Sequence, residues 1–384
     1  MCSLFAINKD KKHIKINILG IKLRLKRLFD SEIYKTFMTK KVEPNTILIT
    51  EFNGSHYETI PGLCKYCTDF GYNVDVLTRE PAEGIFQDFP LDKVRVYECN
   101  EKTFDKIYKN FDFSEYERII YNSKRVYYNK KQFSLEGFDL SKVYNIKKGK
   151  KDNIYLQHHI DKLNETPNDK QIILANPANM EEFEKLVVNS HYFKENVSTN
   201  RDKNEITNFI SIGELSKNRR NSSLLIDAVK ELNQKGIKNF KVTIIGVGKL
   251  EDIPEEIQYY FEILGRVDYQ KMFEKLEQSD FILPLLDPNI KSHKRYMDSG
   301  TSGSFQLIYG FNKPCIIHKT FADIYNFDNS NSIIYPENEI LANKMIEAVE
   351  LKNSEYLELE ANLSKLVQSI DIKSRKNLKS FLDN

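Results

Sequence analysis

From residue 44 onward, short apolar runs alternate with longer segments in which apolar residues recur every three or four positions. Runs rich in Ile, Val and Leu and bounded by Gly, Asn or Pro predict buried strands, and the longer segments predict helices. The first half of the chain has predicted strands at residues 46–50, 73–77, 94–97, 118–121, 153–157, 171–174 and 186–188. The second half has them at residues 208–212, 241–245, 261–264, 281–286, 315–317 and 332–335. Strands that alternate with helices in this way predict parallel sheets.

Several predicted helices have recognisable ends. The helix over residues 57–70 has Pro61 near its start and Gly71 after its end, where helices favour these residues. Another helix follows the strand at 208–212 and stops near Gly236. Further helices are predicted over residues 269–278, from Phe305 onward and from residue 353 to the end of the chain.

A polar stretch at residues 196–207 lacks an apolar period and is interpreted as a linker between two domains. With 384 residues, the chain is long enough for two hydrophobic cores. We therefore expect an α/β protein with two Rossmann-like, doubly wound domains that face a central cleft. The expected parts are a basic N-terminal arm (1–43), a first domain (44–200), a second domain (201–350) and C-terminal helices that pack back on the first domain (351–384).

The N-terminal arm combines alternating polarity with high positive charge. Residues 13–27 alternate between apolar and polar side chains on both sides of Leu19 and Gly20, which predicts a short β-ribbon. Residues 1–41 carry eleven Lys or Arg against three acidic residues, a net charge of +8 in a chain whose total is +2. Two interpretations are open: the ribbon attaches to an anionic membrane surface, or it is an ordinary solvated edge.

The composition indicates a soluble globular protein, with 40% hydrophobic and 29% charged residues. A net charge of +2 argues against a dedicated nucleic-acid binder. The five scattered cysteines are typical of a reducing compartment, and apolar neighbours on the same helical face favour core packing for Cys64 and Cys67 over metal or redox chemistry. Because the sequence shows neither a signal-peptide core nor a membrane-length apolar run, a cytoplasmic location is expected, at the inner face of the membrane if the arm binds lipid.

The candidate chemistry lies in loops that follow strands of the second domain, because open parallel sheets bind ligands beyond these strand ends. The strand at 281–286 is followed by a basic cluster at 291–295, a glycine-serine loop at 299–304 and an apolar helix. Such backbone N–H groups, hydroxyls and cations suit a pyrophosphate, although a flexible surface loop is the alternative interpretation. Neither G-x-G-x-x-G nor G-x-x-x-x-G-K-[ST] occurs, so dehydrogenase and P-loop functions are unsupported.

Several segments resemble one enzyme family. SIGELSKNRRNSSLLIDAVKEL, KVTIIGVG, EILGRVDYQKMFEKLEQSDFILPLL and GTSGSFQLIYGFNKPCII resemble the donor-binding half of GT-B glycosyltransferases, of the retaining type typified by family 4. NGSHYETIPGLCKYCTDFGYNVDVL resembles the first βα unit on the acceptor side of the same enzymes, which include bacterial surface-polysaccharide and lipooligosaccharide transferases. The resemblance implies transfer of a sugar from a nucleoside diphosphate sugar, with a UDP-sugar favoured, to an envelope glycan or glycolipid. It implies no metal and no other cofactor.

The resemblance also implies roles for individual residues. Lys217 with Arg219 or Arg220 would neutralise the diphosphate leaving group. The implied donor-binding residues are Gly213, Lys217, Arg219, Arg220, Gly246, Arg266, Val267, Tyr296, Gly300, Thr301, Ser302, Gly303, Ser304 and Gln306. The implied acceptor-side residues are Asn53, Gly54 and Ser55, and the catalytic candidates are His158, His159 and His56.

The sequence departs from the family where two glutamates commonly stand in the donor loop. Asp298 and Gln306 occupy these positions, so the sugar contacts and the retaining outcome stay open. An inverting enzyme would need a base for the acceptor hydroxyl, for which His56, Glu58 or the pair His158 and His159 are candidates. Two other functions also stay open: a nucleotide-sugar epimerase of the same architecture, and a non-catalytic scaffold in polysaccharide assembly.

Overall fold

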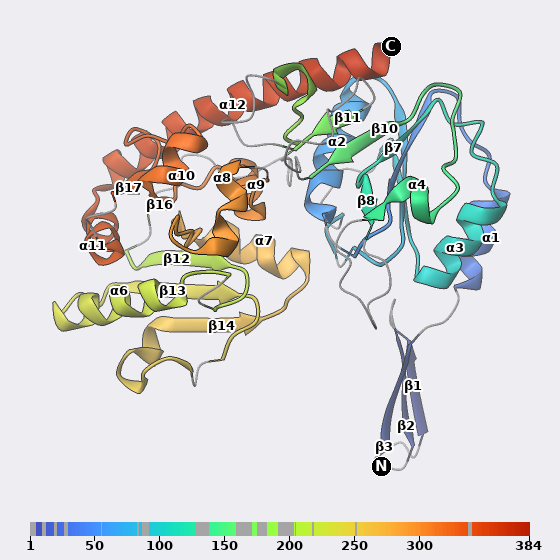
Figure 1. Cartoon of the computed structure of the whole chain (residues 1–384). Coiled ribbons are helices and arrows are strands. Elements are labelled where there is room, and N and C mark those ends of the chain that lie inside the picture. Colours follow the sequence, from blue (N-terminus) through green and yellow to red (C-terminus); the bar gives the residue numbers. More distant parts are fainter. Residues whose placement is uncertain are drawn as a thin grey trace. The chain divides into compact units, whose positions relative to one another are not determined.

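The chain divides into two compact units in the computed structural model (Figure 1). Unit 1 comprises residues 1–83, 90–157 and 170–172, and unit 2 comprises residues 84–89, 158–169 and 173–384. The structure describes residues 5–9, 13–18, 21–26, 30–54, 56–82, 84–86, 92–126, 138–158, 171–174, 183–190, 203, 205–216, 219–249, 252–298, 300–336 and 340–384. The predicted domain boundaries and the packing of the last helix on the first domain stay predictions.

The N-terminal residues form a three-stranded antiparallel sheet. Strand β2 (His13–Ile18) pairs antiparallel with β3 (Ile21–Lys26), which confirms the predicted ribbon. Strand β1 (Phe5–Lys9) pairs with the other edge of β2 and was not predicted, because its five residues are too few to show a period. Helix α1 (Ser31–Thr39) follows and begins at Asp30, whose side chain accepts from the N–H of Ile33.

Unit 1 contains a six-stranded sheet with the standard doubly wound strand order. Its strands are β4 (Thr46–Glu51), β5 (Asn73–Thr78), β6 (Val94–Glu98), β7 (Arg118–Tyr121), β10 (Ile154–Gln157) and β11 (Gln171–Ile173), in the spatial order β11-β10-β7-β4-β5-β6. The pairs that β4 forms with β5 and with β7 are parallel, as predicted. Figure 1 shows α2 (Ile60–Asp69) on one side of this sheet and α1 and α3 (Glu101–Asn110) on the other. Antiparallel strands β8 (Arg125–Val126) and β9 (Phe138–Asp139) and helix α4 (Leu140–Val143) complete the unit.

Helix α2 confirms the prediction for residues 57–70, with a short 3₁₀ turn, η1 (Tyr57–Thr59), in front of it. Gly71 adopts a φ of +89°, the left-handed conformation expected after a helix end. Cys64 and Cys67 are fully buried in α2, and burial raises the pKa of the Cys67 thiol to about 12. The prediction that both cysteines pack in the core is confirmed.

Unit 2 contains a second sheet of the same order. Strands β14 (Phe261–Gly265), β13 (Phe240–Ile245), β12 (Thr207–Ile212) and β15 (Phe281–Ile282) lie side by side in parallel. Cys315 forms a parallel bridge with Ile282, and β16 (Ile316–His318) then pairs with β17 (Ile333–Tyr335). Helices α6 (Ser222–Gln234) and α11 (Leu341–Glu350) pack their apolar residues against one face of this sheet in a shared core. Among the described residues, the other helices are α7 (Tyr269–Gln278), α8 (Arg295–Asp298), α9 (Gly303–Phe311), α10 (Lys319–Ile324) and α12 (Asn353–Asp383), and the 3₁₀ helices are η3 (Glu184–Leu186), η5 (Glu255–Tyr260) and η6 (Lys291–His293).

Two strand predictions are wrong. The strand predicted at 281–286 ends at Ile282, because Pro284 has no N–H to donate and Leu285 adopts a φ of +50°. The strand predicted at 186–188 is the 3₁₀ helix η3 followed by a single bridge between Val187 and Ile173. An apolar run of only three residues does not fix a strand. No helix among the residues described above is apolar over the length that a bilayer requires.

A buried charge cluster fastens α1 to the sheet of unit 1. Asp75 lies fully buried in β5 and accepts from Arg95 Nε at 2.7 Å and from the Tyr116 hydroxyl at 2.6 Å. Lys40, directly after α1, also donates to the Asp75 carboxylate, and its Nζ lies 3.7 Å from the centre of the Phe37 ring. Burial lowers the pKa of Lys40 to about 8, and the Asp75 carboxylate opposes this effect.

We predict that Lys40→Ala lowers the free energy of unfolding by about 3 kcal/mol, because it removes one cation from a buried carboxylate. Lys41→Ala is the matched control: its side chain is exposed, and a change below about 0.5 kcal/mol is expected. Urea denaturation followed by circular dichroism measures both variants. Equal losses of stability in the two variants would contradict the anchoring role of Lys40.

Candidate functional site

The candidate site of unit 2 lies where the strand order reverses. Strand β12 is the first of the sheet in the chain and pairs on one side with β13 and on the other with β15. The connections that leave β12 and β15 therefore diverge, and ligands of doubly wound sheets bind at such switch points. The loop after β12 carries Arg219 and Arg220, and the chain after β15 leads to α8 and α9. The sequence predicted donor contacts in both segments.

Two glycines bring the loops after β12 and β13 into backbone contact. Gly213 and Gly246 have φ values of +131° and +150°, which L side chains rarely adopt. The N–H of Gly213 donates to the carbonyl of Ile245 at 2.8 Å. A Cβ on Gly246 would lie 1.9 Å from the carbonyl oxygen of Gly213, so no side chain fits there. Both residues are thus required by the backbone itself.

The guanidinium of Arg220 links the loop after β12 to the first turn of α9. Its Nε donates to the carbonyl of Ile212 at 2.9 Å, and its Nη1 donates to the carbonyl of Arg219 at 2.9 Å. Its Nη2 donates to Ser304 Oγ at 3.2 Å. Burial lowers the pKa of Arg220 and Tyr296 opposes this effect, but a guanidinium stays charged. Arg220 is therefore a fixed cation with structural hydrogen bonds, whereas the Arg219 side chain is exposed.

His293 ties the segment after β15 to the same loop. Its side chain is buried, Nδ1 accepts from the N–H of Asp287 at 2.9 Å, and Nε2 lies 3.2 Å from the carbonyl of Arg219. With Nδ1 as an acceptor, Nε2 carries the proton and donates. Burial lowers the pKa of His293, so the predicted basic cluster at 291–295 has Lys291, Lys294 and Arg295 as its cations but not His293.

Helix α9 starts at the predicted glycine-serine loop. Ser302 is its N-cap, and Ser302 Oγ accepts from the N–H of Ser304 at 3.3 Å. The hydroxyl of Tyr325 donates to the carbonyls of Tyr296 and Gly300 at 2.9 and 3.2 Å, which fixes the approach to the helix. Gly303 is exposed and Thr301 half-buried. The first turn of α9 thus offers N–H groups and the positive end of the helix dipole beside Arg220.

Gln306 lies one turn further along α9 and is buried. Its Nε2 donates to Asn189 Oδ1 at 3.4 Å, and its Oε1 has no hydrogen-bond partner among the described residues. Arg266 and Val267 follow β14; Arg266 is exposed and Val267 is half-buried. The N–H of Gly246 donates to the carbonyl of Gly265 at 2.9 Å, which holds the end of β14 beside the end of β13. Lys217 lies outside the described residues.

Unit 1 has its own switch point, between β4 and β7, with a polar cluster that the sequence prediction missed. Glu51 ends β4 and is fully buried, and Asn122 and Ser123 directly follow β7. Glu51 accepts from the N–H of Asn53, from Asn122 Nδ2 and from Ser123 Oγ, each at 2.7 Å. An acidic residue that ends an apolar strand, and a polar pair that ends its neighbour, were the signals available in the sequence.

Some of the predicted acceptor-side and catalytic residues lie in the loop after β4, next to this cluster. Asn53 Nδ2 donates to the carbonyl of Arg125 at 3.0 Å, and a Cβ on Gly54 would lie 2.6 Å from Glu80 Oε2. His56 has a φ of +67°, and its Nδ1 lies 3.8 Å from Glu58 Oε1. His158 is buried directly after β10. Ser55 and His159 lie outside the described residues.

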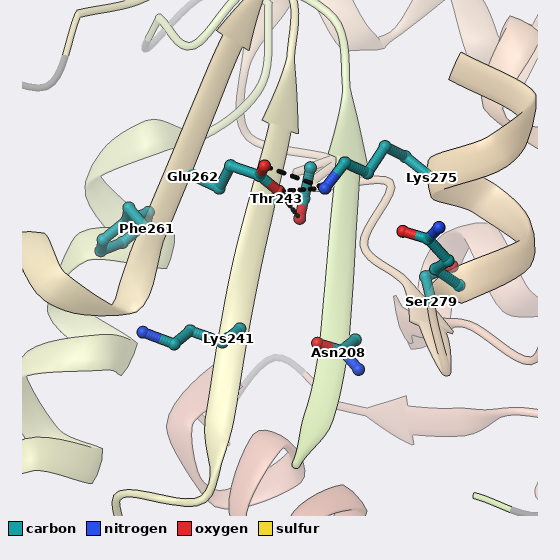
Figure 2. Close-up of a pocket in the computed structure, with 8 residues that line it drawn as sticks. Asn208, Lys241, Thr243, Phe261, Glu262, Lys275 and Ser279 are labelled. Atoms are coloured by element: carbon teal, nitrogen blue, oxygen red, sulfur yellow. Dashed lines mark hydrogen bonds and ion pairs between the residues drawn. The ribbon is translucent and has the colours of Figure 1, made fainter. Parts of the chain in front are cut away.

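A groove on unit 2 lies away from these strand ends. It has a volume of about 520 Å³ and is lined by Asn208, Lys241, Thr243, Phe261, Glu262, Lys275, Gln278 and Ser279. Figure 2 shows Asn208, Lys241, Thr243, Phe261 and Glu262 on the strands and Lys275 and Ser279 at helix α7. Lys275 Nζ lies 2.7 Å from Glu262 Oε2. Asn208 and Lys241 pair in register near the starts of β12 and β13. Because ligands of parallel sheets bind at the opposite strand ends, we place the candidate site at the loops and not in this groove.

We predict that Gly246→Ala strongly destabilises unit 2, by more than about 3 kcal/mol, because a methyl group would overlap the Gly213 carbonyl. Gly236→Ala is the control: Gly236 also has a positive φ of +75°, but a Cβ added at this residue would meet no atom within 4 Å. This control should lose only about 1–2 kcal/mol from backbone strain. Thermal denaturation compares the two variants, and equal losses would show that the close approach is not required.

No family model and no curated protein sequence matches this chain. Among solved structures, HepE of Anabaena in complex with UDP and glucose aligns with a TM-score of 0.52 at 12% identity, over 88% of this chain and 100% of that one. AviGT4, a glycosyltransferase involved in avilamycin A biosynthesis, aligns with a TM-score of 0.49 at 9% identity, over 88% and 98% of the two chains. WaaG, a glycosyltransferase involved in lipopolysaccharide biosynthesis, aligns with a TM-score of 0.46 at 11% identity, over 87% and 98%. With its two doubly wound sheets, the chain has the predicted GT-B fold, that of glycosyltransferases with two Rossmann-like domains.

Proposed function

We propose that this protein is a glycosyltransferase that moves a sugar from a nucleoside diphosphate sugar to an acceptor glycan. The observation that carries the proposal is the meeting of the Arg220 guanidinium with the first turn of α9 at the switch point of unit 2. Fixed positive charge and N–H groups at that place suit a diphosphate. The GT-B fold supports the same function, and the UDP in the HepE structure supports a UDP-sugar as donor.

The proposed chemistry needs stabilisation of the leaving group. As the bond between the anomeric carbon and the diphosphate oxygen breaks, its electron pair stays on the diphosphate, and negative charge develops there. Arg219 and the N–H groups of α9 would contact that charge, while Arg220 adds a positive field and fixes their placement. We propose that these groups act without a metal ion or other cofactor, because they already supply positive charge where the diphosphate would lie.

We propose retention of the sugar's configuration and a bacterial envelope glycan, such as lipopolysaccharide or capsule, as the acceptor. Retention rests on the resemblance to family 4, and the acceptor rests on the resemblance to bacterial surface-polysaccharide and lipooligosaccharide transferases. The family's two glutamates are replaced by Asp298, which is exposed, and Gln306, which is buried and uncharged. Because an amide both donates and accepts hydrogen bonds, Gln306 would hold a hydroxyl group of the donor differently from a glutamate.

The first prediction concerns nucleotide binding to the full chain. UDP should bind in isothermal titration calorimetry with a micromolar dissociation constant, and Arg219→Ala should weaken binding about tenfold by removing one charge-assisted contact. Arg220→Lys should weaken binding at least as much and also lower the melting temperature, because lysine cannot make the three guanidinium bonds. GDP and CMP are titrated in parallel to identify the base.

Lys241→Ala is the matched control for charge, because Lys241 lies in the groove near the strand starts. It should leave UDP binding unchanged. Loss of binding in this variant alone would move the nucleotide site to the groove. Well-folded protein that binds none of the three nucleotides would contradict the transferase function and favour the scaffold, whereas interconversion of a UDP-sugar without acceptor would favour the epimerase.

We also propose that the N-terminal sheet contacts an anionic membrane surface at the inner face of the cytoplasmic membrane. Its register sets Lys15 opposite Arg24, and His13 opposite Lys26, so basic residues gather at matching positions of β2 and β3. Ile16 is opposite both Ile7 and Leu23, so the alternate positions are apolar. Each basic residue near an anionic surface contributes about 1 kcal/mol.

Replacement of Lys22, Arg24 and Lys26 by Glu should abolish sedimentation of the full chain with vesicles that contain phosphatidylserine. The wild-type protein should bind at low salt and be released near 0.5 M salt, because ions screen the attraction. Replacement of the exposed Lys235, Lys238 and Lys376 by Glu is the control for total charge and should leave sedimentation intact. Binding that both triple variants lose equally would argue for a general charge effect instead.

A further inference from the structure

The cluster at the switch point of unit 1 has no role in the proposed donor site. We infer that Glu51 is a positioning residue whose buried carboxylate fixes the loop after β4 and thereby sets the place of His56 and Glu58. Because acceptors bind at this unit in the resembling enzymes, the role of these two residues toward an acceptor hydroxyl rests on the proposed function. The control of the loop by Glu51 is a geometric inference and does not depend on the proposed function.

The carboxylate of Glu51 connects three chain segments. Oε1 accepts from the N–H of Asn53 in the loop that follows, at 2.7 Å. Oε2 accepts at 2.7 Å from both Asn122 Nδ2 and Ser123 Oγ, which follow the neighbouring strand β7. A fully buried carboxylate is costly unless such donors surround it. Its placement therefore joins the loop after β4 to the end of β7.

Asn122 passes this constraint to His56. Its Nδ2 donates both to Glu51 Oε2 and to the carbonyl of His56, the latter at 2.9 Å. Its Oδ1 accepts from Thr59 Oγ1 at 2.8 Å, and Thr59 Oγ1 in turn lies 3.0 Å from the His56 carbonyl. Because both hydrogens and the oxygen of the amide are used, its orientation is fixed. Glu51 and Asn122 thus hold the backbone of His56 from one side.

His56 adopts a conformation that needs such support. Its φ of +67° is left-handed, a conformation that a residue other than Gly adopts only at a cost in free energy. Strained residues of this kind persist where surrounding contacts determine them, and they gather at functional sites. The side chains of His56 and Glu58 are 23% and 22% exposed, so the pair is partly accessible to solvent beyond the carboxyl end of β4.

The charges around His56 favour its protonated form. Burial acts to lower the pKa of His56, but the carboxylates of Glu58, on the same loop, and of Glu51, at the end of β4, raise it overall. Burial raises the pKa of Glu51 itself, against the hydrogen bonds that it accepts. Glu80 brings a further carboxylate to this loop beside Gly54. An imidazole oriented by a carboxylate can bind a sugar hydroxyl and exchange a proton with it.

The test is a pH titration of the histidine ring signals by NMR in the full chain labelled with [¹³C]histidine, with His56→Asn used to assign the His56 signal. In Glu51→Gln, the amide can accept with only one atom and must present its NH₂ group to Asn53 or to Asn122 and Ser123. The ring signal of His56 should therefore move in this variant, and its pKa should fall by about 0.5 or more, because a negative charge is lost. UDP binding should not change.

Asp75→Asn is the matched control, because Asp75 is also a fully buried carboxylate of the same sheet but contacts Lys40, Arg95 and Tyr116 instead. It should lower the melting temperature as Glu51→Gln does, yet leave the titration of His56 unchanged. If Glu51→Gln does not fold, Ser123→Ala removes a single hydrogen bond from Glu51 Oε2. Weaker ionisation of Glu51 should then lower the pKa of His56 by a smaller amount.

Identical titration of His56 in wild type and in the folded Glu51 or Ser123 variant would overturn the inference. So would an equal response to Asp75→Asn, since that would mark a general effect of lost stability. Neither result would count for or against the proposed donor site of unit 2. Failure of the wild-type chain to bind any nucleotide would remove the proposed transferase function and leave the control of His56 by Glu51 intact.

Discussion

The structure depends on one constraint that occurs in both units: a strand that is first in its sheet along the chain and is paired in parallel on both sides. β4 is held between β5 and β7, and β12 between β13 and β15. The connections on the two sides of such a strand leave in opposite directions, which leaves room at its carboxyl end for side chains or a ligand. Both units fill this place with charged side chains.

The two units fill it with opposite charges, and this decides what each place can bind. In unit 2 the guanidinium of Arg220 donates to a carbonyl at the end of β12, to a carbonyl of the loop and to a hydroxyl of α9. The charge at this place is therefore positive. In unit 1 the carboxylate of Glu51 accepts from the loop after β4 and from the two residues that follow β7. The charge at this place is therefore negative, and it lies near His56. The first environment suits a phosphate group and the second suits a hydroxyl that must be oriented or deprotonated.

The sequence was sufficient for the fold because most strands are apolar runs with clear boundaries. The spacing of apolar residues, together with the Gly and Pro residues that bound the segments, is enough to predict both doubly wound sheets. It also predicts the helices at 57–70 and 269–278. The failures have local causes. Pro284 ends a strand that hydrophobicity would extend, and the three-residue run at 186–188 had no neighbours to confirm it. β1 has only five residues, and its pairing with β2 identifies it.

The residue types of the candidate site are visible in the sequence, but their environments are not. Arg219 and Arg220 are identical neighbours in the sequence, yet one side chain is exposed and the other makes three hydrogen bonds to the protein. His293 belongs to a run of basic residues but is buried, and burial lowers its pKa against its hydrogen bonds to Asp287 and Arg219. Burial and hydrogen bonding arise from contacts between segments far apart in the chain, and no local pattern encodes them. For the same reason, Glu51 was not distinguished from other acids.

These environments suggest how a strained or exposed residue is kept in place for chemistry. Arg220 and Glu51 each make three hydrogen bonds to other parts of the protein. Arg219, which is next to Arg220 in the chain, is exposed, and His56, in the loop after Glu51, is partly exposed. The backbone carbonyl of Arg219 accepts from Arg220 and that of His56 from Asn122. A charge that is enclosed can thus fix a backbone, while the adjacent side chain makes the contact. Under the proposed function, such a division would let the ligand-binding residue stay solvated until the ligand arrives, because a separate residue that keeps its protein partners bears the cost of burial.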